Sequence, residues 1–194
     1  MRKLIENTID WQALTGGRLD KENFIIELGQ GVMHKETGVL VIPMTLNFVL
    51  PYDDLLRIKA LVKSRLDFVE DVKFRFRYKD VILSEEEIIK NYMPYLIRIL
   101  EGNGSGFANA IDEKFFAIEE GEKRTLVLHC FGKTCEEQLN ATIAGHFERI
   151  LLKNFGLRFR VEFRNDEETY NEKADVFIQD LREEIARTIE ENNA

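Results

Sequence analysis

The sequence predicts an α+β fold built from two small β-β-α-β units, with linking and C-terminal helices. Two stretches read almost alike, VKFRFRYKD at 72–80 and LRFRVEFRND at 157–166, and each alternates apolar and charged residues as a strand does. A helical pattern precedes each stretch, and a hairpin signal precedes each helix. With 194 residues, the chain is long enough for two such units.

The first unit is predicted to begin with a short helix and a hairpin. Residues 2–14 favour the helix, which should end at Gly16 and Gly17 because glycine commonly follows the last helical turn. The hairpin is predicted over 24–48. Its turn should lie near Gly38, in the run Glu36-Thr37-Gly38.

A helix over 51–68 and the strand at 72–80 complete the first unit. Pro51 suits the helix start, and the acids that follow suit its positive N-terminal end. Apolar residues recur at helical spacing along one side of the segment: Leu55, Ile58, Val62 and Leu66.

A linking helix is predicted after Ser84, which forms a capping box with Glu87. Its buried stripe should comprise Ile88, Tyr92, Leu96 and Ile99. Pro94 lies inside this helix and is expected to kink it, and GNGSG should end it. The run FANAID is predicted to add one more helical turn.

The second unit is predicted to repeat the first at a fixed offset. Its hairpin turn should lie near Gly121, and its helix should span 136–154 with a capping box of Thr134 and Glu137. Phe74 and Phe159 are separated by 159 − 74 = 85 positions. We therefore expect 38–80 to superpose on 123–165. The alternative is that alternating strands resemble one another by default.

The acidity of the chain lies mostly in its last segment. The net charge is −8, and residues 167–194 carry 3 basic and 9 acidic residues, or 3 − 9 = −6. The remainder is nearly balanced, so net charge neither demands nor excludes a nucleic-acid partner. An apolar stripe predicts a helix over about 170–190. It has no C-cap signal, which we interpret as a natural chain that continues.

We find no pattern that predicts catalysis, a cofactor or a metal. Gly132-Lys133-Thr134 resembles part of a phosphate loop, but Val127 stands where that loop requires glycine. His129, Cys130 and Cys135 are too few for a structural zinc site. Two cysteines make no disulfide framework, and no signal peptide or apolar span is evident. We therefore expect a cytoplasmic protein without a membrane partner.

The strand at 72–80 supplies the candidate contact residues. Alternation should place Phe74, Phe76 and Tyr78 on one face and the basic residues on the other. The aromatic rings either stack on bases or pack in the core, and we favour the core because the helix at 51–68 needs an apolar sheet face. The candidates for partner or nucleic-acid contact are Lys73, Arg75, Arg77 and Lys79, partly repeated by Arg158, Arg160 and Arg164.

The order of these pieces resembles one protein family over roughly 20–190. An N-terminal helix and hairpin lead to LPYDDLLRIKALVKSRLDF and the basic strand, then to LSEEEIIKNYMPYLIRIL. RTLVLHCFGKTCEEQLNATIAGHFERILLKNFGLRFRVEF and a charged helix follow. This order is similar to the N-terminal region of the PolC-type DNA polymerase III alpha subunit of Gram-positive bacteria. That family has two small domains ahead of its nucleic-acid-binding barrel, exonuclease and polymerase parts.

The resemblance implies a domain division and a fold. Residues 1–82 would be the first N-terminal domain, and 83–166 the second, similar to the alpha-binding domain of the clamp-loader tau subunit. Residues 167–194 would form an acidic helix leading to the rest of the parent chain. Both domains would resemble incomplete type II KH folds, but the Gly-x-x-Gly loop with which KH domains clamp nucleic acid is absent from its usual place.

The resemblance also implies a function. The parent protein would be a DNA-directed DNA polymerase with 3′–5′ exonuclease activity, and this segment carries none of the acids of either active site. The expected role is docking of replisome proteins, the clamp loader or other replication factors, with weak binding of single-stranded DNA. The alternative is a free-standing KH-like protein that binds single-stranded nucleic acid.

Overall fold

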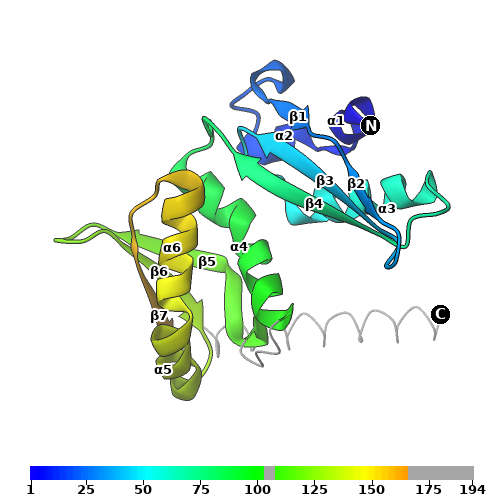
Figure 1. Ribbon diagram of the computed structural model, residues 1–194. Coiled ribbons are helices and arrows are strands. Elements are labelled where there is room, and N and C mark those ends of the chain that lie inside the picture. Colours follow the sequence, from blue (N-terminus) through cyan, green and yellow to red (C-terminus); the bar gives the residue numbers. More distant parts are fainter. Residues whose placement is uncertain (103–107, 166–194) are drawn as a thin grey trace, which may run out of the picture. The chain divides into compact units, whose positions relative to one another are not determined.

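The computed structural model describes residues 1–102 and 108–165, which belong to two compact α+β units, each with one small sheet (Figure 1). The segment Arg149–Arg158 packs with the first unit, and so does the helix at 85–102. The division expected from the sequence had put both in the second domain. The helix predicted over 170–190 lies outside the described residues.

The first sheet has a central strand with neighbours on both edges. Its strands are β1 (Ile26–Leu28), β2 (Val32–His34), β3 (Val39–Leu46) and β4 (Asp71–Tyr78). β1 and β2 pair antiparallel with the two halves of one edge of β3, and β4 pairs parallel with the other edge (Figure 1). The predicted turn before β3 is confirmed, and Gly38 adopts φ 64° there.

A proline explains why β1 and β2 are two strands and not one. Pro43 lies in the middle of β3 and has no N–H to donate. Its carbonyl oxygen accepts a hydrogen bond of 2.9 Å from the Gly29 N–H. The pairing register then shifts by one residue, since 28 + 44 = 72 whereas 32 + 41 = 73. Proline in a sheet is tolerated at such bulges.

Four α-helices of the described residues accompany the first sheet: α1 (Arg2–Thr8), α2 (Trp11–Thr15), α3 (Tyr52–Ser64) and α4 (Glu85–Gly102). A 3₁₀ helix (Lys21–Asn23) precedes β1. The single helix predicted over 2–14 is wrong, because Ile9 is extended and the Asp10 carboxylate caps a new helix by accepting from the Ala13 N–H. The predicted capping box of α4 is confirmed by hydrogen bonds between Ser84 and Glu87 in both directions.

The core of the first unit lies between α3 and one sheet face. Ile58 and Val62 of α3 are at most 1% exposed, as predicted from their spacing. On the sheet they meet the buried side chains of alternate residues: Ile42, Met44, Leu46 and Val72. Ile42, Met44 and Leu46 alternate along β3, and Val72 of β4 pairs with Leu40, two residues before Ile42. These side chains therefore lie on the same face of the sheet.

The second unit contains the remaining described elements. These are a 3₁₀ helix (Ala108–Ala110), β5 (Ile111–Glu119), β6 (Thr125–Cys130), α5 (Lys133–Thr142), the first part of α6 (Ala144–Phe155) and β7 (Arg160–Asn165). From Arg149 on, α6 belongs to the segment that packs with the first unit. β6 is central, antiparallel to β5 and parallel to β7. The predicted turn near Gly121 is confirmed.

The single helix predicted over 136–154 is wrong, and so is its cap. Helix α5 begins one residue after Gly132, whose φ of 93° excludes most other residues, and Thr134 makes no cap. The helix is interrupted at Ile143. There the His146 N–H donates a hydrogen bond to the carbonyl of Ile143, three residues back. Thr142 and Ile143 are both β-branched and Gly145 follows, so local helix propensity is low.

The strand order of the two units is the same, but the constant offset is wrong. Val39 pairs with Asp71, a separation of 32, whereas Thr125 pairs with Arg160, a separation of 35. One offset of 85 therefore cannot hold for both strands of each pair. The extra residues belong to the two-helix connection in the second unit. Phe159 lies just before β7, not inside it.

We expect Gly38→Ala to destabilise the first unit more than Gly16→Ala. Both glycines have φ near 60°, where alanine costs about 1–2 kcal/mol. A Cβ on Gly38 would also lie 2.8 Å from the Glu70 Cβ, whereas one on Gly16 meets nothing within 4 Å. That contact should add about 1 kcal/mol. Urea denaturation followed by Trp11 fluorescence measures both losses, and equal losses would mean that the Glu70 loop moves aside freely.

No helix in the described part of the chain is long and apolar enough to cross a membrane.

Candidate interface on the open face of the first sheet

The face of the first sheet opposite the core is the candidate site, and we call it the open face. Alternation along β4 turns three exposed cations onto it, and their partners on β3 are half-buried. The paired residues are Lys73 with Val41, Arg75 with Pro43, and Arg77 with Thr45. On the far side of β3, Val32 and Glu27 extend the same face.

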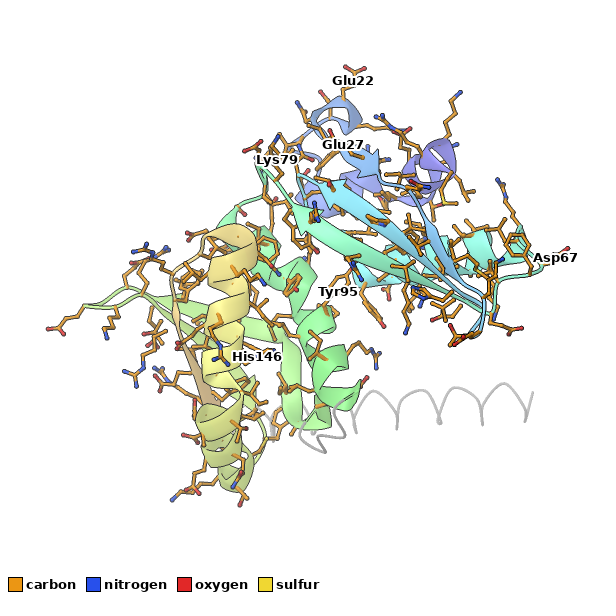
Figure 2. All side chains as sticks on the ribbon, in the orientation of Figure 1. Glu22, Glu27, Asp67, Lys79, Tyr95 and His146 are labelled. Atoms are coloured by element: carbon orange, nitrogen blue, oxygen red, sulfur yellow. The ribbon has the colours of Figure 1, made fainter. Side chains whose placement is uncertain are left out.

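The cations of the open face have no partners among the described residues. We call Lys73, Arg75, Arg77 and Lys79 the basic row. Figure 2 labels Lys79 just beyond the end of β4 and Glu27 on β1. No described side chain forms an ion pair or hydrogen bond with the basic row. Within residues 1–102 and 108–165, these four charges are therefore not neutralised by an ion pair.

Nearby acids do little to neutralise the basic row. The Asp71 carboxylate lies 3.3 Å from the Lys59 Nζ and also accepts the Val72 N–H at 2.8 Å. Glu27 is exposed at the other edge of the sheet, beyond the half-buried Thr45. The open face is thus basic along β4 and apolar in its middle.

The aromatic side chains of β4 face the core, as predicted, and are not available for base stacking. Phe74, Phe76 and Tyr78 are half-buried against the core cluster. The Phe76 and Tyr95 ring centroids are 6.0 Å apart, and those of Tyr78 and Tyr92 6.2 Å. The aromatic face of β4 is thus covered by side chains of α4 as well as of α3. Burial, together with the neighbouring tyrosines, raises the pKa of Tyr78 well above its ordinary value.

The second unit does not repeat the basic row. The Arg164 guanidinium makes two hydrogen bonds to the Glu119 carboxylate, at 2.6 and 2.8 Å, and a third to Glu162 at 3.0 Å. These bonds lower the pKa of Glu119. Arg160 is exposed on β7, and Arg158 is exposed in the segment that packs with the first unit. Of the two stretches, only β4 presents a continuous row.

The Gly132-Lys133-Thr134 stretch serves the fold of the second unit. The Gly132 N–H donates to the Asn165 Oδ1 at 2.9 Å, and its carbonyl accepts the Glu136 N–H that begins α5. The N–H of Gly132 is therefore not directed at a phosphate.

The two cysteines are buried and unbridged. Burial, with Cys135 nearby, raises the pKa of the Cys130 thiol to about 12, so it stays protonated and unreactive at neutral pH. Within residues 1–102 and 108–165, no three His, Cys, Asp or Glu side chains are placed to hold a metal ion.

The sequence did not reveal the apolar half of the open face. Val32 is 53% exposed, and Val41 and Pro43 are half-buried beside it. The run VLVIPMTL in β3 is almost continuously apolar, so it carries no alternation to show which residues face outward. The proline at position 43 was the available signal, because a central strand with proline requires a bulge.

Comparisons with known proteins add little. No family model and no curated protein matches this chain. Among solved structures, the crystal structure of APE1850 is similar at 13% sequence identity, covering 84% of this chain and 96% of that chain with a TM-score of 0.28. At this level the similarity supports no statement about fold or function.

Proposed function

We propose that this chain is a non-catalytic N-terminal segment of a PolC-type DNA polymerase III alpha subunit, and that it docks proteins of the replication machinery. The clamp loader or another replication factor would be the partner, and single-stranded DNA would bind weakly. The parent chain would carry the polymerase and 3′–5′ exonuclease activities in the cytoplasm.

The main support for this proposal is the chemistry of the open face. It combines an apolar centre at Val41 and Pro43 with four cations that no described side chain neutralises. Interfaces between proteins commonly join an apolar centre to a charged rim, which sets the rate and specificity of association. The aromatic rings that a sheet-based RNA binder would expose are turned to the core here.

The shared β-β-α-β order supports the finer proposal that both units are incomplete type II KH folds. By resemblance, the region 83–166 would correspond to the alpha-binding domain of tau. The junction of α5 and α6 reads Thr142-Ile143-Ala144-Gly145 and has no Gly-x-x-Gly loop to clamp phosphates. This favours protein docking over a free-standing KH-like protein that binds single-stranded nucleic acid.

We expect binding of single-stranded DNA that is detectable at low salt and nearly lost at physiological salt. Four cations that neutralise four phosphates give a log–log salt slope of roughly −3, about 0.7 × 4. The net charge of −8 opposes any tighter binding. Fluorescence anisotropy with a labelled oligonucleotide measures affinity and slope, and Arg75→Glu/Arg77→Glu should abolish the binding.

A matched variant controls for net charge. Lys63→Glu/Arg65→Glu makes the same charge change at exposed positions at the C-terminal end of α3, off the open face. It should weaken DNA binding much less than the Arg75/Arg77 variant. Submicromolar affinity that persists at physiological salt would overturn protein docking and support the nucleic-acid-binding alternative.

A further inference from the structure

We propose that β4 binds an extended acidic peptide by strand addition along its outer edge. The peptide would pair its backbone with Phe74 and Phe76 and place alternate acidic side chains beside the basic row. This inference rests on the docking function proposed above and specifies its ligand.

The backbone of Phe74 and Phe76 points away from the sheet. The Lys79 N–H donates to the Leu46 carbonyl of β3 at 2.9 Å, so the odd-numbered residues of β4 direct their backbone groups at β3. The even-numbered residues then direct theirs outward. Among the described residues, neither the Phe74 nor the Phe76 N–H finds a partner on that side.

The available stretch is bounded at both ends. At the start of β4, the outward Val72 N–H is already bonded to the Asp71 carboxylate at 2.8 Å. At the other end, Phe155 lies 4.7 Å from the Tyr78 ring, centroid to centroid, and Tyr92 packs on the same ring. Phe74 and Phe76 lie between, so the free edge suits a short strand.

The corresponding edge in the second unit is closed. The outward N–H of Val161 on β7 donates to the Glu148 carboxylate at 2.9 Å. The Phe163 N–H and carbonyl are both bonded to the Asn140 side chain, at 2.9 and 2.7 Å. The Asn165 N–H donates to the Glu136 carboxylate at 3.2 Å.

The contrast with β7 indicates that the uncovered edge of β4 is a site where another strand can pair. Unpaired edge strands attract other strands, and folded proteins normally cover or charge them. Helices α5 and α6 cover β7 with polar side chains, whereas the described residues give β4 no such cover at Phe74 and Phe76. Charges flank this edge on the open face, which favours an oppositely charged strand and disfavours self-pairing.

The spacing of the basic row selects an extended ligand. Alternate residues of a strand are about 6.6 Å apart, and an added strand has the same repeat. A peptide with an acid at every second position therefore sets one carboxylate beside each of Lys73, Arg75 and Arg77, and opposite charges on neighbouring strands stabilise pairing. Its other side chains would be apolar, because they lie beside the half-buried Phe74 and Phe76.

A nucleic acid strand fits this edge less completely than a peptide. Phosphates can neutralise the cations, but a phosphate backbone has no amide donor for the outward carbonyls of Phe74 and Phe76. Only a peptide backbone donates and accepts at the same spacing.

The test uses the full chain and three synthetic peptides with the same numbers of glutamate and valine residues. In the first, glutamate alternates with valine; in the second, the same peptide is N-methylated at the amides that would face β4; in the third, the glutamates form one block. We expect the alternating peptide to bind tightest. N-methylation should weaken it about tenfold, since two backbone hydrogen bonds are lost.

Site-specific readouts complete the experiment. Bound alternating peptide should slow hydrogen exchange at the Phe74 and Phe76 amides, and Arg75→Glu/Arg77→Glu should weaken binding at least about tenfold, through lost ion pairs and new repulsion. Lys63→Glu/Arg65→Glu should change it little.

The outcomes separate this inference from the proposed function. Equal affinity of all three peptides, with unchanged exchange at Phe74 and Phe76, would overturn strand addition and leave charge-driven docking in place. Absence of binding by any peptide would also overturn strand addition. If single-stranded DNA then bound tightly at physiological salt, the docking function itself would fall.

Discussion

Phe147→Ala is expected to lower the free energy of unfolding of the second unit by about 3–5 kcal/mol. Phe147 lies in α6 and is 0% exposed, and its ring centroid is 5.8 Å from that of Phe163, which is also 0% exposed. Removing the ring leaves a cavity between helix and sheet that rigid neighbours cannot fill. Urea denaturation followed by far-UV circular dichroism measures the loss.

Two variants make this result specific. Phe147→Leu keeps much of the volume and should lose clearly less. Leu152→Ala makes an alanine substitution in the same helix at a side chain that is 48% exposed, and should change stability by about 0.5 kcal/mol or less. A loss below about 1 kcal/mol for Phe147→Ala would mean that α6 does not depend on this contact for its place against the sheet.

Features of the fold that depend on near neighbours in the sequence were predictable. The buried residues Ile58 and Val62 followed from helical spacing, and the Ser84 capping box followed from two residues three positions apart. The outward direction of Arg75 and the inward direction of Phe76 followed from the period of a strand. Each of these depends on local geometry that a single segment specifies.

Features that depend on distant residues were not predictable. Arg164 was a candidate contact residue, but Glu119 binds its guanidinium from 45 positions away. The edge of β7 is closed by Asn140, whose partner, the Phe163 backbone, lies 23 positions further on. The sequence does not show which backbone N–H or carbonyl group a distant side chain will bond to, because nearly every residue carries the same backbone groups.

The helix break at Ile143 is a third feature that the sequence did not predict. The apolar spacing continues across it through Phe147 and Leu151, which are both buried. Periodicity therefore indicated one long helix. It could not distinguish one continuous helix from two successive helices that bury the same face. Weak local propensity at Thr142 and Ile143 was present in the sequence, but propensity alone rarely decides a boundary.

Asn47→Ala is expected to destabilise the first unit by about 2–4 kcal/mol. Asn47 follows β3 and is 4% exposed. Its Oδ1 accepts the Ile25 N–H at 2.8 Å, and its Nδ2 donates to the Asn23 carbonyl at 2.9 Å. Alanine leaves both backbone groups without this partner, and each such group costs about 1–3 kcal/mol where water cannot replace the lost hydrogen bond.

Asn154→Ala is the matched control for this prediction. Asn154 is half-buried, belongs to a segment of the same unit, and makes one hydrogen bond of 3.2 Å to the Tyr92 hydroxyl. Its loss should be about 0.5–1.5 kcal/mol. Trp11 packs on Phe24, next to Asn23, with ring centroids 5.0 Å apart, so Trp11 fluorescence during urea denaturation reports both variants.

Asn47 also separates stability from docking. It joins the start of β1 to the end of β3, while its carbonyl accepts the Ile82 N–H after β4, so it lies outside the edge formed by Phe74 and Phe76. Well below the unfolding transition, Asn47→Ala should therefore bind the alternating acidic peptide with nearly unchanged affinity. Arg75→Glu/Arg77→Glu should show the reverse, with lost binding and little change in stability, because exposed unpaired cations contribute little to folding. If both variants lost binding in proportion to stability, the open face would serve the fold and not a partner.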